Sequence, residues 1–309
     1  MVLESWEELI GARIGPNDRY EIVRRVGDGG MGVVFEAHED RRDRRVAIKF
    51  LKSDGAADPE TLERFRREGS RFSRLSHPNI VRVFGLGRAR GLFYIASEFV
   101  DGSDLYDILK EGGGLLPVAR SLEIVRDVAL ALQTAHANDI IHRDLKPENV
   151  MIERKTGIVK ILDFGIAKDL NASMALTVKG TYLGTPAYSA PEQIRGQRLD
   201  ARADIFSLGV ILYELVTGEL PFTGSRATQV LANTLKTEPV SPRAINDEVS
   251  APVGRLIEDM IQKKPRKRPD SCSLVVQRVD EIMAAIGDGL SPDDSKGVVG
   301  FLRGFFNDN

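Results

Sequence analysis

The chain has 309 residues, of which 42% are hydrophobic and 28% charged, and its formal net charge is −2. This composition is typical of a folded globular protein long enough to build two hydrophobic cores, and it excludes a largely disordered chain. The balanced charge excludes bulk electrostatic attraction to nucleic acid or to an anionic membrane, so any partner must be recognised locally.

The chain contains one cysteine, Cys272, which excludes an internal disulfide and fits a reducing cytoplasm. Its plainest interpretation is an inert small side chain. The longest apolar stretch, SLGVILYELVTG at 207–218, is too short to cross a membrane and contains Glu214. The first residues are acidic where a secretion signal needs basic ones. We therefore expect a cytoplasmic chain without a transmembrane segment.

The first predicted element is a short helix within an amino-terminal extension over 1–19. Ser5 and Glu8 have the spacing of a capping box, and Trp6 shares a helical face with Leu9 and Ile10. We expect this helix to dock on the strand-rich part that follows.

Three strands are predicted next, because short apolar stretches are broken by glycine in YEIVRRVG, GVVFEAHE and RRVAIKFL. Gly27, Gly29 and Gly32 form a G-x-G-x-x-G-x-V pattern between the first two strands. Taken alone, the pattern is weak and more often indicates a plain hairpin turn. A strand follows these glycines, whereas a helix follows them in the dinucleotide-binding motif. Such a hairpin has little side-chain bulk, so its backbone N–H groups can lie over the phosphates of a nucleotide.

The third predicted strand carries an amine on the face opposite its apolar side chains. Period two puts Ala47 and Lys49 on one face, and Val46 and Ile48 on the other. Taken alone, Lys49 is consistent with an ordinary surface lysine.

A helix is predicted after the third strand, because Asp58 followed by Pro59 is a helix-start signal. Its apolar stripe consists of Leu62, Phe65, Phe72 and Leu75. Glu68 lies on the same stripe, where an unpaired carboxylate would be costly to bury. We expect Glu68 to pair with Lys49, which would also hold the ammonium against phosphate oxygens.

Most long segments after residue 117 predict helices, including 119–137 and 202–218, and no internal repeat is present. Between two apolar runs, HRDLKPEN at 142–149 puts charged and polar side chains where the chain otherwise predicts core. Taken alone, Asp144 and Asn149 are consistent with a polar turn held by their own side-chain hydrogen bonds.

Several motifs follow one another in order: the glycine hairpin, VAIK at 46–49, Glu68, HRDLKPEN, DFG at 163–165 and APE at 190–192. Together they resemble the motif set of eukaryotic-type protein kinases over about residues 20–283. The forms GDGGMGVV and GTPAYSAPE are most similar to bacterial Ser/Thr kinases. The resemblance implies an α+β, two-lobed fold with a kinase domain at 20–286. A small antiparallel-sheet lobe with one key helix would occupy 20–97 and a larger, mainly helical lobe 98–286, followed by a linker and apolar tail at 287–309.

The resemblance implies a Ser/Thr protein kinase that transfers the γ-phosphate of ATP to hydroxyls of protein substrates. Phosphoryl transfer needs positioning and charge neutralisation more than covalent chemistry, which explains the polar interruption of the core. By the resemblance, Asp144 is the catalytic base and Lys146 lies beside the γ-phosphate. Asn149 and Asp163 hold Mg²⁺, with Mn²⁺ as an alternative. The implied catalytic residues are Asp144, Lys146, Lys49 and Glu68, and Lys146 with Thr185 follows the Ser/Thr rather than the tyrosine-kinase pattern.

The nucleotide site is also implied by the resemblance. Glu98 and Val100 would pair with adenine through their backbone, and Asp104 would lie near the ribose. Ser97 would be the gatekeeper, whose small side chain leaves space behind the base. The residues expected to line the site are Val26, Gly27, Gly29, Gly32, Val34, Ala47, Lys49, Glu98, Val100, Asp104 and Met151.

The resemblance further implies regulation by phosphorylation between DFG and APE. Thr181 and Thr177 are the expected acceptors, with plain polar loop residues as the alternative. A phosphate bound by Arg64, Arg143 and Lys168 would tie this segment to the helix that carries Glu68.

Three other polar residues are expected to have structural roles. Asp204 is either the N-cap of the helix that follows or, by the resemblance, a hydrogen-bond acceptor for the catalytic-loop backbone. Glu192 and Arg268 would form a buried ion pair. The run KKPRKRP at 263–269 is therefore read as structural, and no nucleic-acid partner is expected.

Two other function classes stay open. A catalytically dead scaffold usually lacks Lys49, Asp144 or Asp163, and a small-molecule phosphotransferase lacks the segment ending in APE.

The last segment carries an apolar stripe at Val298, Phe301, Leu302, Phe305 and Phe306. We expect it to dock on the kinase or a partner, or to mediate self-association, since that many exposed aromatic rings favour aggregation. The alternative is a floppy tail or a fragment of a longer chain.

Overall fold

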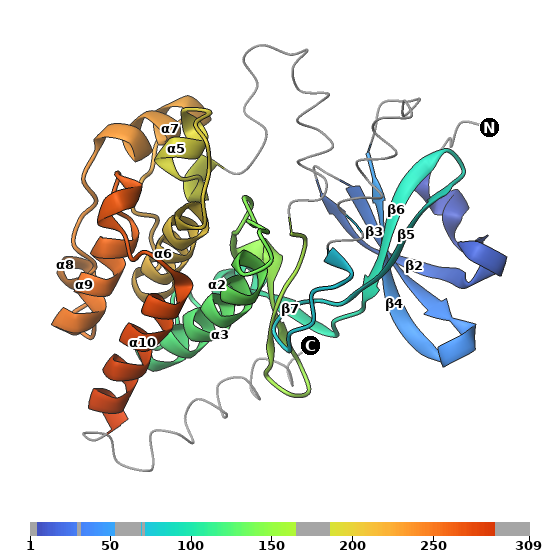
Figure 1. The fold of residues 1–309 in the computed structure, drawn as a ribbon, viewed down its shortest axis with the longest axis horizontal. Helices are drawn as coiled ribbons and strands as arrows, with labels where there is room; N and C mark the ends of the chain where they lie inside the picture. The colour runs from blue at the N-terminus through green and yellow to red at the C-terminus, as the bar shows by residue number, and fades with distance from the viewer. Residues whose placement is uncertain (1–4, 30–31, 53–68, 70–71, 165–185, 288–309) are drawn as a thin grey trace. The chain divides into compact units, whose positions relative to one another are not determined.

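The structure is a computed structural model that describes residues 5–29, 32–52, 69, 72–164 and 186–287. Contacts between Cα atoms divide it into two compact units, which meet in sequence at Val100 and Asp101. The first unit contains most of the strands and the second most of the helices (Figure 1).

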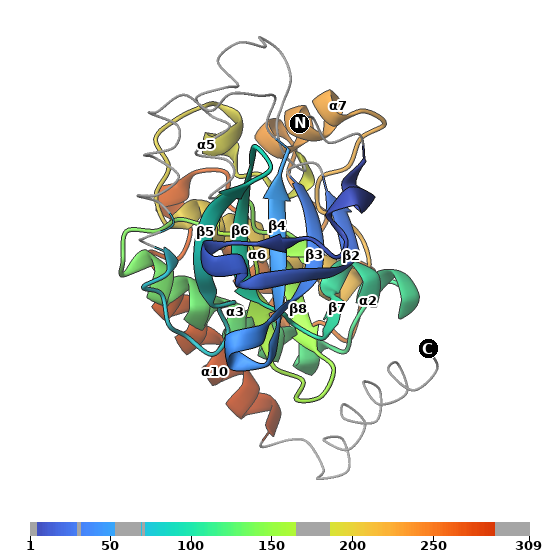
Figure 2. The same ribbon diagram turned by 90° about the vertical axis from the view of Figure 1, so that its right-hand side faces the viewer.

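Within its described residues, the first unit is built on six antiparallel strands in the order β1-β2-β3-β4-β6-β5. Figure 2 shows β5, β6, β4, β3 and β2 side by side across the sheet. The elements are the 3₁₀ turn η1 (Trp6–Leu9), β1 (Arg13–Ile14), η2 (Pro16–Asp18), β2 (Tyr20–Gly29), β3 (Gly32–Glu39), η3 (Asp40–Arg42), β4 (Arg44–Leu51), β5 (Val83–Ala89) and β6 (Leu92–Glu98). The three strands predicted from the alternating pattern are confirmed as β2, β3 and β4.

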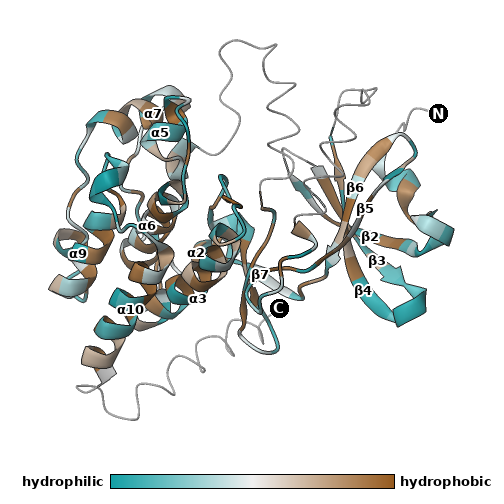
Figure 3. Ribbon diagram, viewed as in Figure 1, coloured by the Kyte–Doolittle hydropathy of each residue, from teal (hydrophilic) through white to brown (hydrophobic). Residues whose placement is uncertain are grey.

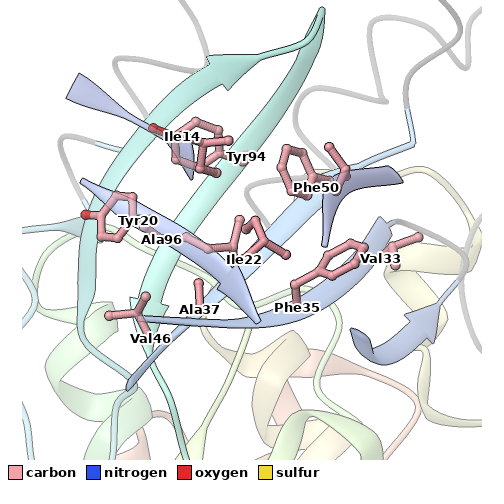
Figure 4. Close-up of a cluster of buried hydrophobic side chains, with 12 residues drawn as sticks. Ile14, Tyr20, Ile22, Val33, Phe35, Ala37, Val46, Phe50, Tyr94 and Ala96 are labelled. Atoms are coloured by element: carbon pink, nitrogen blue, oxygen red, sulfur yellow. The ribbon is translucent and has the colours of Figure 1, made fainter. Parts of the chain in front are cut away.

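One face of this sheet is covered by an apolar cluster in which aromatic rings meet (Figure 4). The ring of Phe50 lies 5.9 Å from the rings of Phe35 and Tyr94 and 6.2 Å from that of Trp6, measured between centroids. Figure 3 shows apolar stretches along the strands and a hydrophilic tip where β3 turns into β4. Burial of this face explains why apolar residues alternate along these strands.

The amino-terminal segment lies on the same cluster, as the sequence predicts. The capping box between Ser5 and Glu8 is present, and Leu9 is completely buried. One detail of the prediction is wrong, because Ile10 is 46% exposed. The turn ends at Leu9 and Ile10 has extended backbone, so it leaves the face that Trp6 and Leu9 share.

The helix predicted after β4 lies mostly outside the described residues. Of its expected apolar stripe, Phe72 and Leu75 are described, and both are buried.

The second unit contains, among its described residues, a small antiparallel sheet in the order β7-β8-β9 and a set of packed helices. The elements are β7 (Gly102–Asp104), α2 (Leu105–Glu111), α3 (Val118–His136), η4 (Pro147–Asn149), β8 (Val150–Glu153), β9 (Val159–Ile161), η6 (Pro186–Tyr188), α5 (Pro191–Ile194), α6 (Arg202–Thr217), α7 (Ala227–Lys236), α8 (Pro242–Ile245), α9 (Ala251–Met260), η7 (Pro265–Lys267) and α10 (Cys272–Gly287). The helices predicted at 119–137 and 202–218 are confirmed as α3 and α6.

Helix α6 forms the centre of this unit. Nearly all of its residues are buried, which fits its apolar sequence on every side. Helices α3 and α9 pack against it. At Gly209 an added Cβ would lie 2.6 Å from the Cβ of Met260, so glycine is what allows α6 and α9 to approach this closely. Among the helices that the structure describes, none has the length and apolar character needed to cross a membrane.

Candidate active site

The sheet face opposite the apolar cluster carries the side chains predicted to contact a nucleotide. Val34 is paired with Lys49 across β3 and β4, and Ala47 is paired with Ser97 across β4 and β6. All four side chains are half-buried, whereas their chain neighbours Val33, Val46, Ile48 and Ala96 are completely buried on the cluster side. The predicted separation of Ala47 and Lys49 from Val46 and Ile48 is therefore confirmed.

The predicted glycine hairpin joins β2 to β3. Gly27 pairs with Val34 and Gly29 with Gly32, and Val26 beside them is 40% exposed. At Gly32 an added Cβ would lie 2.2 Å from the carbonyl oxygen of Phe50, so this glycine is required by the close approach of β3 and β4. At Gly27 and Gly29 the nearest described atoms would lie at 3.9 and 3.8 Å, an ordinary contact distance. Packing within the described structure thus requires glycine at 32 but not at 27 or 29.

The segment that ends the first unit holds the residues expected to meet adenine. Glu98 pairs with Val46, its backbone N–H donates to the carbonyl of Arg82 at 2.8 Å, and its carboxylate accepts from the N–H of Arg82 at 3.2 Å. Val100 is 8% exposed. The backbone N–H of Glu98 is therefore already used within the first unit.

Asp204 anchors the loop at 142–149 of the second unit. Its two carboxylate oxygens accept from the backbone N–H groups of His142 at 2.8 Å and Arg143 at 2.9 Å. Nε2 of His136 lies 2.8 Å from the same carboxylate and donates to it, because an ionised carboxylate only accepts. Burial acts to raise the pKa of Asp204, but the hydrogen bond from His136 and the other neighbours outweigh it and lower the pKa. Asp204 is therefore ionised although it is completely buried.

Of the two predicted roles of Asp204, the contact with the loop backbone is confirmed and the N-cap is wrong. Helix α6 begins at Arg202 with Ala201 as its cap residue. Asp204 thus lies inside the first turn, and its side chain accepts hydrogen bonds from the loop and from His136.

His142 links the loop to the segment that leads into DFG. Its Nδ1 accepts from the N–H of Asp144 at 3.3 Å, so the ring donates from Nε2 to the carbonyl of Leu162 at 2.9 Å. Its ring also lies 4.8 Å from that of Phe164, measured between centroids. His142 is completely buried and holds two chain segments together.

Asn149 makes a second link between the same segments. Its Nδ2 donates to the carbonyl of Asp144 at 2.7 Å, and its own carbonyl accepts from the N–H of Leu162 at 2.8 Å. Arg143 and Asp163 have positive φ angles of 63° and 48°, the left-handed backbone that residues other than glycine rarely adopt. One side-chain and one backbone hydrogen bond of Asn149 therefore join it to Asp144 and to Leu162, the residue before Asp163.

Asp104 and Met151 are neighbours in the small sheet, where they pair across β7 and β8. The carboxylate of Asp104 also caps α2 by accepting from the N–H of Asp107 at 2.9 Å. Burial raises the pKa of Asp104 to about 6. Lys146 precedes Met151 in the chain, and its Nζ lies 3.8 Å from the carboxylate of Glu148.

The predicted buried ion pair is confirmed. Arg268 contacts both carboxylate oxygens of Glu192 at 2.6 and 2.8 Å, and it donates to the carbonyl of Arg202 at 2.8 Å. One arginine of the basic run at 263–269 is therefore fully used inside the unit.

Two contacts around the site were not predicted. The hydroxyl of Tyr188 donates to the carboxylate of Glu214 at 2.6 Å, which joins the segment before APE to α6, and burial raises the pKa of both groups. The sequence held one signal for this contact, because Glu214 is an isolated glutamate inside the apolar run SLGVILYELVTG and needs a polar partner. His136 is the second case, since its Nδ1 also lies 3.7 Å from the buried sulfur of Cys272. No local pattern identifies that contact, because the two residues are distant in sequence.

Six predicted residues lie outside the described part of the chain: Arg64, Glu68, Lys168, Thr177, Thr181 and Thr185. The ion pair between Lys49 and Glu68 and the phosphate-binding cluster therefore stay predictions.

Comparison with known proteins assigns the chain to a family. A model of the protein kinase domain matches residues 20–279. The chain belongs to the protein kinase family. The expected α+β kinase fold, with an antiparallel-sheet part and a helical part, is confirmed by this match and by the solved structures described next. Protein kinases as a family use ATP and a divalent metal ion and act on proteins.

Bacterial serine/threonine-protein kinases are among the similar proteins. Serine/threonine-protein kinase PknB of Mycobacterium leprae is 41% identical over 256 residues, which cover 82% of this chain and 41% of that protein. Serine/threonine-protein kinase pkn3 of Myxococcus xanthus is 42% identical over 274 residues, which cover 86% of this chain and 50% of that protein. The crystal structure of the PknI kinase domain of Mycobacterium tuberculosis has a TM-score of 0.69 at 29% identity and covers 85% of this chain and 96% of that one. The chain thus spans about two fifths to one half of the length of these full-length relatives.

Proposed function

We propose that this kinase chain is a cytoplasmic serine/threonine protein kinase that transfers the γ-phosphate of ATP to protein hydroxyls. One observation carries the proposal. Asp204 anchors the backbone of the loop at 142–149. His142 and Asn149 bind this loop to Leu162, the residue before Asp163, so that the carboxylates and the amide predicted for catalysis lie on segments held together by hydrogen bonds. The relatives' names, all serine/threonine-protein kinases, support the same activity.

The donor set fits a hard divalent cation, Mg²⁺ or alternatively Mn²⁺. Nδ2 of Asn149 donates to the carbonyl of Asp144, which leaves the amide oxygen of Asn149 as the group that could ligate a metal. That oxygen and the carboxylate of Asp163 are the oxygen ligands that Mg²⁺ prefers. When bound, the cation would neutralise phosphate charge; Asp144 would accept the proton of the substrate hydroxyl and Lys146 would face the γ-phosphate.

The nucleotide would lie on the sheet face that carries Val34, Ala47, Ser97 and Lys49. The absence of a packing reason for glycine at 27 and 29 supports a close approach of phosphates to the hairpin backbone. The carbonyl of Glu98 would meet the adenine amine and the N–H of Val100 would meet the ring, because the N–H of Glu98 donates to the carbonyl of Arg82.

The test is transfer of labelled phosphate from ATP with Mg²⁺ to a Ser/Thr protein substrate. Asp144→Asn should lower kcat by about 10²- to 10⁴-fold, because the proton acceptor is lost. The exposed Asp247, changed to Asn, should leave transfer unchanged and serves as the matched control. Binding of nucleotide without any transfer would favour a scaffold, and label on a small molecule alone would favour a small-molecule phosphotransferase.

Regulation by phosphorylation extends the proposal to Thr177 and Thr181. Of the residues expected to bind the phosphate, the structure describes Arg143. The carbonyl of Arg143 accepts a hydrogen bond from the side-chain amide of Gln193 at 2.7 Å, and Gln193 follows APE directly. Mass spectrometry after incubation with ATP should find phosphate at these threonines, and the double Thr→Ala variant should lose activity. An unphosphorylated segment together with full activity of that variant would contradict it.

Docking of the carboxyl-terminal apolar stripe on the kinase or a partner, or its self-association, also remains a proposal, and it lies outside the described residues. Deleting 296–309 should change activity, stability or oligomeric state, and no change in all three would contradict it.

A further inference from the structure

The amino-terminal segment at 5–14 packs against the strand that carries Lys49. Trp6 contacts the ring of Phe50, the residue after Lys49 in β4. The carbonyl oxygen of the same Phe50 is the atom that an added Cβ at Gly32 would meet. The segment therefore packs on the same residue of β4 whose backbone lies closest to Gly32 at the base of the glycine hairpin.

A row of charged side chains joins the same segment to the hairpin itself. Glu7 lies 3.1 Å from Arg25 of β2, and the other amino group of Arg25 pairs with Asp28. The Nζ of Lys52 lies 2.5 Å from Asp28 and donates to the carbonyl of Gly29 at 3.1 Å. We call Glu7, Arg25, Asp28 and Lys52 the hairpin charge chain. The hydrogen bond from Lys52 lowers the pKa of Asp28, so this carboxylate is charged at neutral pH.

The hairpin charge chain contacts the hairpin at its glycines. Asp28 lies between Gly27 and Gly29, whose backbones have wide conformational freedom and no side chain to hold them. Its carboxylate and the carbonyl of Gly29 are both bound to Lys52. The charged groups are partly exposed, 61% for Glu7 and 43% for Asp28, so their interactions weaken as salt rises.

We propose that the amino-terminal segment and the hairpin charge chain position the glycine hairpin for nucleotide binding, with Glu7, Asp28 and Lys52 as positioning residues. The inference rests on the proposed function, because it assigns these residues to the nucleotide site of the kinase. It predicts effects on nucleotide affinity rather than on phosphoryl transfer.

The first test compares the KM for ATP in three variants. Glu7→Gln and Asp28→Asn should each raise KM about two- to fivefold, the range for exposed ion pairs, and leave kcat within about twofold. Glu21→Gln is the matched control, because Glu21 pairs with Arg13 at 2.7 Å at similar exposure and joins the same segment to β2 away from the glycines. High salt should shrink the difference between wild type and the two variants.

The combination of Glu7→Gln with Asp28→Asn tests whether the residues act as one chain. Its KM should equal that of the worse single variant, because either change breaks the same connection. An increase in KM equal to the product of the two single effects would show that the residues act independently. That result would contradict their action as one chain.

A second readout needs no catalysis. Trp6 is the only tryptophan in the sequence, so tryptophan emission reports on the segment alone. Titration with ADP and Mg²⁺ should produce a saturable change in the emission of wild type and of Glu21→Gln, and a smaller change at saturation in Asp28→Asn.

Unchanged KM in Glu7→Gln and Asp28→Asn, with emission that does not respond to bound ADP, would overturn the inference. If wild type binds ADP but transfers no phosphate, the proposed function fails, and the emission and affinity measurements still decide the inference. A wild type that binds no nucleotide overturns both.

Discussion

Asp104 carries a carboxyl group whose charge is set by its burial at the start of α2. Its pKa of about 6 lies above the value of about 3.9 expected in an unfolded chain. The native state therefore binds more protons than the unfolded state between about pH 4 and pH 6, and Asp104 lowers the free energy of unfolding as pH rises through that window.

Asp104→Asn should remove this dependence and keep the helix cap, because asparagine caps helices as well as aspartate does. Urea unfolding of both proteins at several pH values measures it. The variant should gain stability relative to wild type as pH rises from about 4 to about 7. A stability difference that stays constant across the window would contradict the assignment of this pKa.

Ser97 is the residue whose size should decide which adenine-site ligands fit. It is half-buried and pairs with Ala47 on one side and Val83 on the other, so its immediate neighbours are small or medium in size. Ser97→Met should lower the affinity for a purine analogue with a bulky substituent about tenfold or more, because the methionine overfills the space. ATP binding should be retained, and Ser97→Ala should bind both ligands as wild type does. If Ser97→Met binds the bulky analogue as tightly as wild type does, Ser97 does not lie behind the adenine.

At the scale of elements, the antiparallel pair β3 and β4 depends on one glycine. Gly32→Ala would put a methyl group against the carbonyl of Phe50, so the strands must separate. We expect a loss of about 1–3 kcal/mol in the free energy of unfolding of the sheet unit.

Gly29→Ala is the contrasting variant, since its added methyl meets no described atom closer than 3.8 Å. It should leave stability nearly unchanged and raise the KM for ATP. Denaturant unfolding and ATP kinetics of both variants separate packing from ligand contact. Equal losses of stability in the two variants would contradict this interpretation.

At the scale of the whole molecule, Asp204 joins parts of the second unit that lie far apart in sequence. Its partners are His136 at the end of α3 and the loop backbone at His142 and Arg143. Asp204→Asn would turn an amide NH₂ group toward N–H donors inside a buried network. We expect a loss of about 3–5 kcal/mol in the free energy of unfolding, together with loss of activity.

Asp200→Asn is a suitable control, because Asp200 is half-exposed beside the start of α6 and pairs with Arg202 at 3.0 Å. It should cost no more than about 1 kcal/mol. Asp204 has a lowered native pKa, so its contribution is present above the unfolded pKa and is lost as pH falls through the native one. Denaturant unfolding at neutral pH compares the variants, and a loss of stability in Asp204→Asn no larger than in the control would refute the anchoring role.

The family, the order of the motifs, strands β2 to β4, and helices α3 and α6 could all be predicted from the amino-acid sequence alone. Each of these is encoded locally, because alternation along a strand and apolar spacing along a helix reflect the side that faces the core. The common face of Ala47 and Lys49 followed from strand period alone. The order of the motifs then allowed the role of Asp144 to be predicted.

The contacts between distant groups could not be predicted in this way and become visible in the folded chain. Asp204 is an anchor rather than an N-cap, Tyr188 binds Glu214, and Cys272 lies on His136, although at least 26 residues separate the partners of each contact along the chain. The row of charges from Glu7 to Lys52 likewise exists only once β2 and β4 are folded beside the amino-terminal segment. Local patterns specify which side of an element is buried, whereas hydrogen bonds between elements depend on how packing and burial bring their polar groups together.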